Sequence, residues 1–113
     1  MSTKPRVLIE SPYGGGRPEL VTYLERAIAD SLFRGEAPFA SHRLYPGILD
    51  DTVPEQRRRG IEAGFAWGEV AHFVAVYDDY GITAGMQEGL RRWSWRGIRV
   101  ESRAIGQNGG GSA

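Results

Sequence analysis

The chain has 113 residues, 41% of them hydrophobic and 25% charged, and its 14 basic and 14 acidic residues cancel. This length predicts a single domain, and the balanced charge argues against binding to a nucleic acid polymer. The chain has no cysteine, which excludes disulfides, thiolate metal sites and a cysteine nucleophile. No apolar run reaches the ~20 residues that a membrane span requires. A strand follows the N-terminus directly, so we expect a cytoplasmic protein with no signal peptide and no membrane partner.

The first part of the chain predicts a strand, a helix and a second strand. The aliphatic run at residues 6–10 is typical of a buried central strand. Apolar residues then recur at helical spacing over residues 18–34, where Pro18 suits the first helical position and Gly35 a left-handed cap. Residues 37–41 are consistent with a second, shorter strand.

The remainder predicts two more helix–strand units. Residues 43–53 show no clear period and predict a loop, after which a proline begins a helix at residues 54–68. The strongest strand signal lies within residues 70–77. A helix over residues 83–96 and an alternating strand at residues 98–102 complete the pattern.

This alternation of strands and helices favours right-handed crossovers and a mainly parallel sheet. We therefore expect a single Rossmann-like, three-layer α/β domain over residues 1–105, with about four strands and about three helices. Residues 106–113 are rich in glycine and low in complexity, and predict a disordered tail.

A glycine-rich loop follows the first strand and is a candidate ligand site. Glycines let backbone amides approach an anion, and the following helix contributes a partial positive charge at its N-terminus. The loop matches neither a dinucleotide fingerprint nor a phosphate-binding P-loop, and a purely steric turn is the alternative. The residues predicted to bind ligand here are Ser11, Pro12, Gly14, Gly15 and Arg17.

A second candidate site follows the third strand. Asp78 and Asp79 end that strand, and Thr83 begins a helix that carries Glu88. In an open α/β sheet, ligands bind beyond the carboxyl ends of the strands. An ionised Glu88 near a helix N-terminus could act on the anomeric carbon of a sugar as a nucleophile or a stabilising charge. The alternative is that Glu88 is an exposed helical residue and Asp79 a turn residue.

Two further groups of residues have alternative roles. His42, after the second strand, is a candidate ligand-binding acid or base, a backbone cap or a contact to a partner chain. The run Arg57-Arg58-Arg59 spreads around its helix, which favours a solvated face over contact with an acidic group or a phosphate. Two separated histidines and no cysteine argue against a transition-metal site. The pairs Asp50-Asp51 and Asp78-Asp79 could bind magnesium, but adjacent carboxylates on a strand point to opposite faces and chelate poorly unless the backbone turns. We therefore expect no metal and no cofactor.

Several short motifs carry a family resemblance over residues 6–104. They are Ser11-Pro12-Tyr13 after the first strand, Ser41-His42 after the second, Asp79-Tyr80-Gly81, and Gly85-Met86-Gln87-Glu88. On these motifs the chain resembles the nucleoside 2-deoxyribosyltransferase-like superfamily, which includes small phage and bacterial proteins of unassigned function. The resemblance implies a sugar and base site with three catalytic residues: Glu88 as the nucleophile, Tyr13 to orient it, and Asp79 to contact the base. It also implies ligand contacts from Gly81, Thr83, Gly85 and Met86.

Three functional hypotheses follow. The first is a nucleoside- or nucleotide-binding domain that cleaves or transfers at an N-glycosidic bond through Glu88. The second is a non-enzymatic phage-type protein that binds or sequesters a nucleotide signal. It is favoured because Gln87 stands between Gly85-Met86 and Glu88, whereas catalytic members place the glutamate directly after Gly-Met. The third is an interaction module in which Trp67, Trp93 and Trp95 form an apolar surface. We also expect a homo-oligomer, since so small a chain needs a neighbour to close its pocket.

Overall fold

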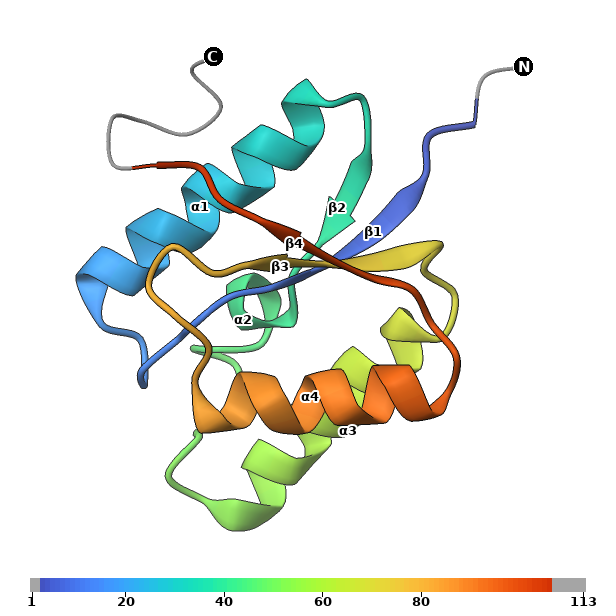
Figure 1. The fold of residues 1–113 in the computed structure, drawn as a ribbon. Helices are drawn as coiled ribbons and strands as arrows, with labels where there is room; N and C mark the ends of the chain where they lie inside the picture. Colours follow the sequence, from blue (N-terminus) through green and yellow to red (C-terminus); the bar gives the residue numbers. More distant parts are fainter. Residues whose placement is uncertain (1–2, 107–113) are drawn as a thin grey trace.

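Four parallel strands form one sheet in the order β2-β1-β3-β4 (Figure 1). The computed structural model describes residues 3–106, so residues 107–113 of the predicted tail lie outside the described part. Hydrogen bonds pair Leu8 of β1 with Val74 of β3, which places the two most apolar strands at the centre. The strand bounds are β1 Arg6–Glu10, β2 Ala37–Phe39, β3 Phe73–Tyr77 and β4 Val100–Arg103.

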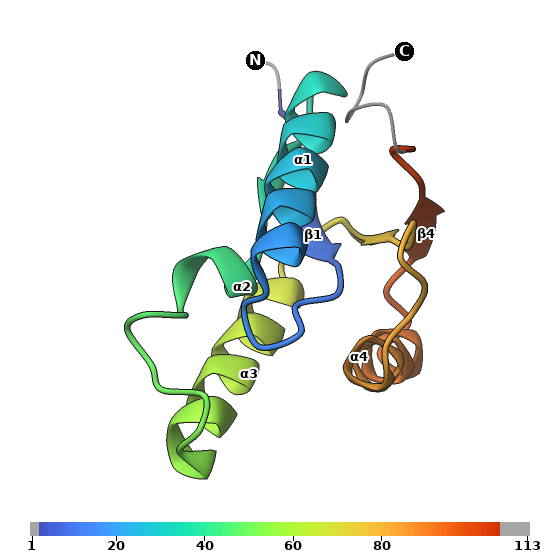
Figure 2. The same cartoon turned by 90° about the vertical axis from the view of Figure 1, so that its left-hand side faces the viewer.

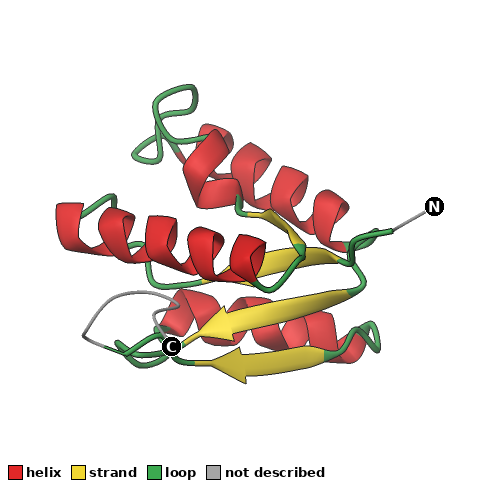
Figure 3. Cartoon of the chain, turned by 90° about the horizontal axis from the view of Figure 1, so that it is seen from above, coloured by secondary structure: helices red, strands yellow, loops and turns green. Residues whose placement is uncertain are grey.

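Helices cover both faces of this sheet, which confirms the predicted α/β class. α1 lies on one side of the sheet, and α3 and α4 lie on the other (Figures 1 and 2). Seen from above, the strands lie next to one another between these helices (Figure 3). The helix bounds are α1 Pro18–Phe33, α2 Ser41–Leu44, α3 Pro54–Gly68 and α4 Ala84–Trp95.

The core is divided by the sheet into two apolar layers, because successive strand side chains point to opposite faces. The layer under α1 contains Val7, Ile9, Ala75 and Tyr77 from the strands together with Tyr23, Leu24 and Ala27 from α1. The layer under α3 and α4 contains Leu8, Val74 and Val76 together with Met86 and Trp93 from α4. All five residues of β3 are buried, as expected for a parallel strand covered on both faces.

Trp93 fixes the contact between α3 and α4. Its side chain is 1% exposed, and it packs against the backbone of Gly68 at the end of α3. A Cβ at Gly68 would lie 2.1 Å from the Trp93 ring, so only glycine fits there. Trp93 therefore belongs to the core, which corrects its predicted place in an apolar surface. Trp67 and Trp95 are exposed, at 53% and 91%.

The short helix α2 is the main departure from the prediction. The second strand ends at Phe39, and Ser41, predicted as its last residue, begins α2 instead. The change of conformation follows Ala40, whose extended backbone leads into the helical turn. α2 packs against α3 at Gly64, where a Cβ would lie 3.2 Å from Ser41.

Other boundaries differ by small amounts. β3 begins at Phe73 rather than at Val70, because residues 69–72 form the turn that follows α3. β4 covers Val100–Arg103 instead of residues 98–102. Within residues 3–106, no helix combines the length and the apolar character that crossing a bilayer requires.

Candidate functional site

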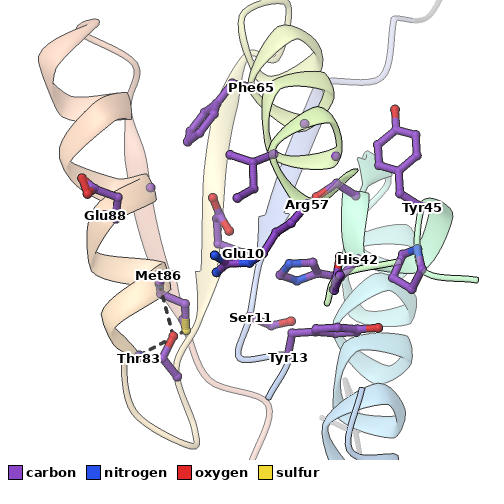
Figure 4. Close-up of a pocket in the computed structure, with 18 of the residues that line it drawn as sticks. Glu10, Ser11, Tyr13, His42, Tyr45, Arg57, Phe65, Thr83, Met86 and Glu88 are labelled. Carbon is purple, nitrogen blue, oxygen red and sulfur yellow. Dashed lines mark hydrogen bonds between the residues drawn. The ribbon is translucent and has the colours of Figure 1, made fainter. Parts of the chain in front are cut away.

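A pocket of about 990 Å³ lies beyond the carboxyl ends of β1 and β3. From β1 the chain enters α1 on one face, and from β3 it enters α4 on the other. The two loops therefore diverge, which creates the crevice that ligands occupy in open α/β sheets. The close-up shows α4 on one side of the pocket and α2 and α3 on the other (Figure 4). Its volume lies within the range of small-molecule sites.

Most of the predicted site residues meet in this pocket, although they come from three separate segments. The lining includes nine of them: Ser11, Tyr13, Gly14, Gly15, His42, Thr83, Gly85, Met86 and Glu88. Four others lie outside it, namely Pro12, Arg17, Asp79 and Gly81. Arg17 forms an ion pair with Glu19 instead, at 2.6 Å.

Ser11 is a buried polar residue without a partner. Its side chain is 3% exposed, and its Oγ makes no hydrogen bond within the described residues. A buried hydroxyl left unpaired costs about 1–3 kcal/mol. Such a group in a native protein calls for a bound molecule or another explanation. Because Ser11 lines the pocket, its hydroxyl is a candidate ligand contact.

The glycine loop owes its shape to positive φ angles. Gly14, Gly15 and Gly16 have φ values of +57°, +71° and +90°, a region that other residues rarely adopt. A Cβ at Gly14 would also lie 2.9 Å from Leu20 of α1. The glycines are therefore needed for the shape of the turn, and Gly14 and Gly15 also line the pocket.

Tyr13 and His42 form a stacked aromatic pair at the mouth of the pocket. Their ring centroids lie 4.4 Å apart with planes inclined by 23° (Figure 4). Desolvation lowers the pKa of His42, although the nearby charge of Asp51 opposes this effect. Burial and the same Asp51 charge raise the pKa of Tyr13. The pair therefore presents neutral rings, which suits stacking on a flat ligand more than proton transfer.

The N-terminus of α4 forms the opposite wall. The Thr83 side chain accepts a hydrogen bond from the Met86 amide at 3.2 Å, which fixes the first turn of the helix. Met86 is buried against the sheet, while Thr83 and Gly85 line the pocket. The helix dipole makes this end favourable for a negative group of a ligand.

Glu88 lies at the rim of the pocket and not at its centre. Its side chain is 63% exposed, and it pairs with Arg91 one turn further along α4 at 3.5 Å. In Figure 4 its carboxylate lies over α4, while the centre of the pocket lies between α4 and α3. Gly89, the next residue, is buried and faces Glu10. One residue on a helix is about 100° of rotation, which accounts for the outward direction of Glu88.

Asp79 has a structural role on the other face of the sheet. Its carboxylate accepts hydrogen bonds from the Tyr23 hydroxyl and from the amides of Ile105 and Gly106. Burial opposes its ionisation, but these donors outweigh burial and lower its pKa. Asp79 thus joins α1 to the segment after β4, and the structure does not bring it together with Tyr13 and Glu88.

Glu10 is a pocket residue that the sequence analysis missed. It ends β1 and lines the pocket beside Ser11. Its Oε2 accepts a hydrogen bond from the Trp93 indole nitrogen at 3.0 Å. Desolvation raises its pKa, against the opposing effect of the Trp93 hydrogen bond. A signal was present, since the last residue of a parallel strand lies at the ligand-binding edge.

Two arginines add positive charge to the lining. Arg57 of α3 is the member of the arginine run that reaches the pocket; Arg58 pairs with Glu55 on the same helix. Arg92 of α4 stacks over the Phe65 ring, with its guanidinium carbon 3.8 Å from the centroid. Both cations are suited to bind an anionic group such as phosphate.

The described residues contain no cluster of three histidine, aspartate or glutamate side chains that could hold a metal ion. A search among curated proteins finds no match. The model of one protein family, by contrast, matches residues 5–103, which is nearly the whole of the described structure. The chain therefore belongs to that family, the domain of unknown function DUF7768.

Proposed function

We propose that this domain binds a nucleoside or nucleotide in the crevice between α3 and α4. The observation that carries the proposal is the unpartnered, buried hydroxyl of Ser11 within a pocket of about 990 Å³ at the switch point of the sheet. A pocket of this size holds a ligand larger than a free sugar or a free base. The resemblance to nucleoside 2-deoxyribosyltransferases supports the same ligand class.

The lining offers a partner for each part of such a ligand. The stacked rings of Tyr13 and His42 provide a flat surface for a base. The Ser11 hydroxyl is suited to a sugar hydroxyl or a base edge. Arg57 and the N-terminus of α4 provide positive charge for a phosphate.

The proposed reaction is cleavage or transfer at the N-glycosidic bond. In this mechanism Glu88 attacks or stabilises the anomeric carbon, and Tyr13 orients the reacting groups. Glu88 has to leave its ion pair with Arg91 and turn toward the pocket for this step. A carboxylate beside the anomeric carbon stabilises the cationic transition state of glycoside chemistry.

The test is base release, measured by chromatography on a panel of deoxynucleosides, ribonucleosides, their 5′-monophosphates and NAD. We expect Glu88→Ala to lose activity while Glu62→Ala retains it. Glu62 is a matched control, since it is an exposed glutamate on α3 that does not line the pocket. If wild type leaves every substrate intact, the enzymatic part of the proposal is wrong.

A second candidate function is non-enzymatic binding or sequestration of a nucleotide signal. The exposure of Glu88 and its ion pair with Arg91 favour it, because the predicted nucleophile points away from the pocket centre. This function predicts that a bound nucleotide is recovered unchanged after prolonged incubation with the protein. Release of free base during that incubation would contradict it.

The proposal includes self-association of the protein in the cytoplasm. Tyr45 and Leu49, from the segment between α2 and α3, line the pocket, and in this proposal a second copy covers the ligand on their side. Light scattering tests this part directly. A monomeric mass at high protein concentration, with and without ligand, would refute it.

A further inference from the structure

Glu10 places a carboxyl group at the floor of the pocket, between β1 and α4. Its Oε2 accepts the Trp93 indole N–H at 3.0 Å, and Trp93 is held rigidly in the core. A Cβ at Gly89 would lie 3.0 Å from the same oxygen, a tight contact, so glycine at this position lets the carboxyl lie close against α4. The position of the carboxyl is therefore fixed by two contacts from α4.

The second oxygen of Glu10 is available to a ligand. Oε1 makes no hydrogen bond within residues 3–106, and the residue lines the pocket. In Figure 4 the Glu10 side chain points into the space between α4 and α3. One oxygen of Glu10 thus binds the protein, and the other has no partner in the described part of the chain.

The charges around Glu10 come from every element that surrounds the pocket. None of these groups forms an ion pair with Glu10 in the described part of the chain, and desolvation raises its pKa. Glu10 therefore holds its proton at pH values where an ordinary glutamate has lost it. The titratable and charged groups that share the lining are Tyr13, His42, Tyr45, Asp51, Arg57, Glu88 and Arg92.

We propose that Glu10 is a catalytic acid and base of this pocket, whose Oε1 donates a proton to the base of a bound nucleoside or nucleotide. This inference rests on the proposed function. As the C1′–N bond breaks, its electron pair stays with the base, and the Oε1 proton moves to a base nitrogen. Water then adds to C1′ and gives a proton to the Glu10 carboxylate, which restores the acid.

The first test follows the Trp93 indole N–H resonance by NMR from about pH 4 to about pH 9, a range that covers ordinary and raised carboxyl pKa values. We expect a titration in wild type with a midpoint above the ordinary glutamate value. Glu10→Gln, which keeps an oxygen acceptor for Trp93 but cannot ionise, abolishes it, and Glu88→Gln leaves it unchanged. A midpoint at or below the ordinary value, or a titration that persists in Glu10→Gln, would overturn the inference.

The second test uses 2′-deoxyadenosine 5′-monophosphate and its nucleoside as probes. We expect wild-type base release to fall as the pH rises through the Trp93 midpoint. Glu10→Gln should lose about 100-fold or more in kcat, the usual contribution of general acid catalysis, with little change in Kd. Wild-type rates in Glu10→Gln, or binding without base release in wild type, would overturn the role of Glu10 and leave the binding function standing. Failure of wild type to bind either probe would instead contradict the proposed function.

Discussion

The contact between Gly68 and Trp93 gives the sharpest prediction about stability. It also bears on the pocket, because Trp93 donates a hydrogen bond to Glu10 in the pocket lining. Gly68→Ala adds a Cβ that would lie 2.1, 2.6 and 2.7 Å from three atoms of the Trp93 ring. The ring cannot retreat easily, because it is 1% exposed, packs on Phe65 at 4.8 Å between centroids and donates to Glu10. We therefore expect α3 and α4 to move apart.

The expected cost follows from this geometry. Overpacking a core usually costs about 1–3 kcal/mol, and a clash with three ring atoms belongs at the upper end. Alanine in place of a helical glycine raises the unfolding free energy by about 0.5–1 kcal/mol, because the unfolded chain loses conformational entropy. The net loss is about 2 kcal/mol, which corresponds to a fall in Tm of about 8 °C for a domain of this size.

Thermal and urea unfolding, followed by circular dichroism, measure this loss. Gly60→Ala is the matched control within α3, since a Cβ there meets only the end of the Leu49 side chain at 3.2 Å. We expect this control to unfold at or slightly above the wild-type midpoint, because alanine favours the helix and the end of the Leu49 side chain can move. A Gly68→Ala protein whose unfolding free energy lies within about 0.5 kcal/mol of wild type would refute the reasoning about the α3–α4 contact.

Three further predictions concern the pocket and its surroundings. Arg57→Ala should weaken the binding of a nucleoside 5′-monophosphate by about 10-fold or more, as expected for the loss of a charge-assisted hydrogen bond. Calorimetry on both variants should show this loss for Arg57→Ala and wild-type affinity for Arg58→Ala; equal effects would exclude a phosphate contact at Arg57. The pKa of Glu10 in the folded protein is raised above the ordinary value of 4.5, so wild type loses stability relative to Glu10→Gln as the pH rises through the folded value. Melting curves of both proteins across pH measure this loss, and a difference in stability that does not change with pH would contradict it. Asp79→Ala should lower the unfolding free energy by about 1–3 kcal/mol through its lost hydrogen bond to Tyr23, and its affinity for the ligand should equal that of wild type. A lower affinity in this variant would show that Asp79 contacts the ligand.

Much of the fold could be predicted because its elements carry clear periods. The buried run of β3 and the helical spacing of α1 are long enough to identify without tertiary context. α2 escaped prediction because four residues are too few to show a helical period. Its helical turn depends on packing against Gly64 of α3, a contact that sequence spacing does not reveal.

A residue of the site could be predicted where its position after a strand is enough to place it in the pocket. Ser11 and Thr83 follow strands at the carboxyl edge, and the topology brings them into one pocket. The direction of individual side chains was harder to predict. Asp79 lies two residues after Tyr77, and it faces α1 as Tyr77 does. Glu88 turns outward because Gly89 occupies the inward position on α4.

The central claim is that a nucleoside or nucleotide binds at the switch point of the sheet. A titration of 15N-labelled protein with 2′-deoxyadenosine 5′-monophosphate, followed through the backbone amide resonances, tests it most directly. We predict the largest shifts at Ser11, Gly14, His42 and Gly85, with none at the exposed Trp67. Absence of saturable shifts, or shifts centred on Trp67, would contradict the claim.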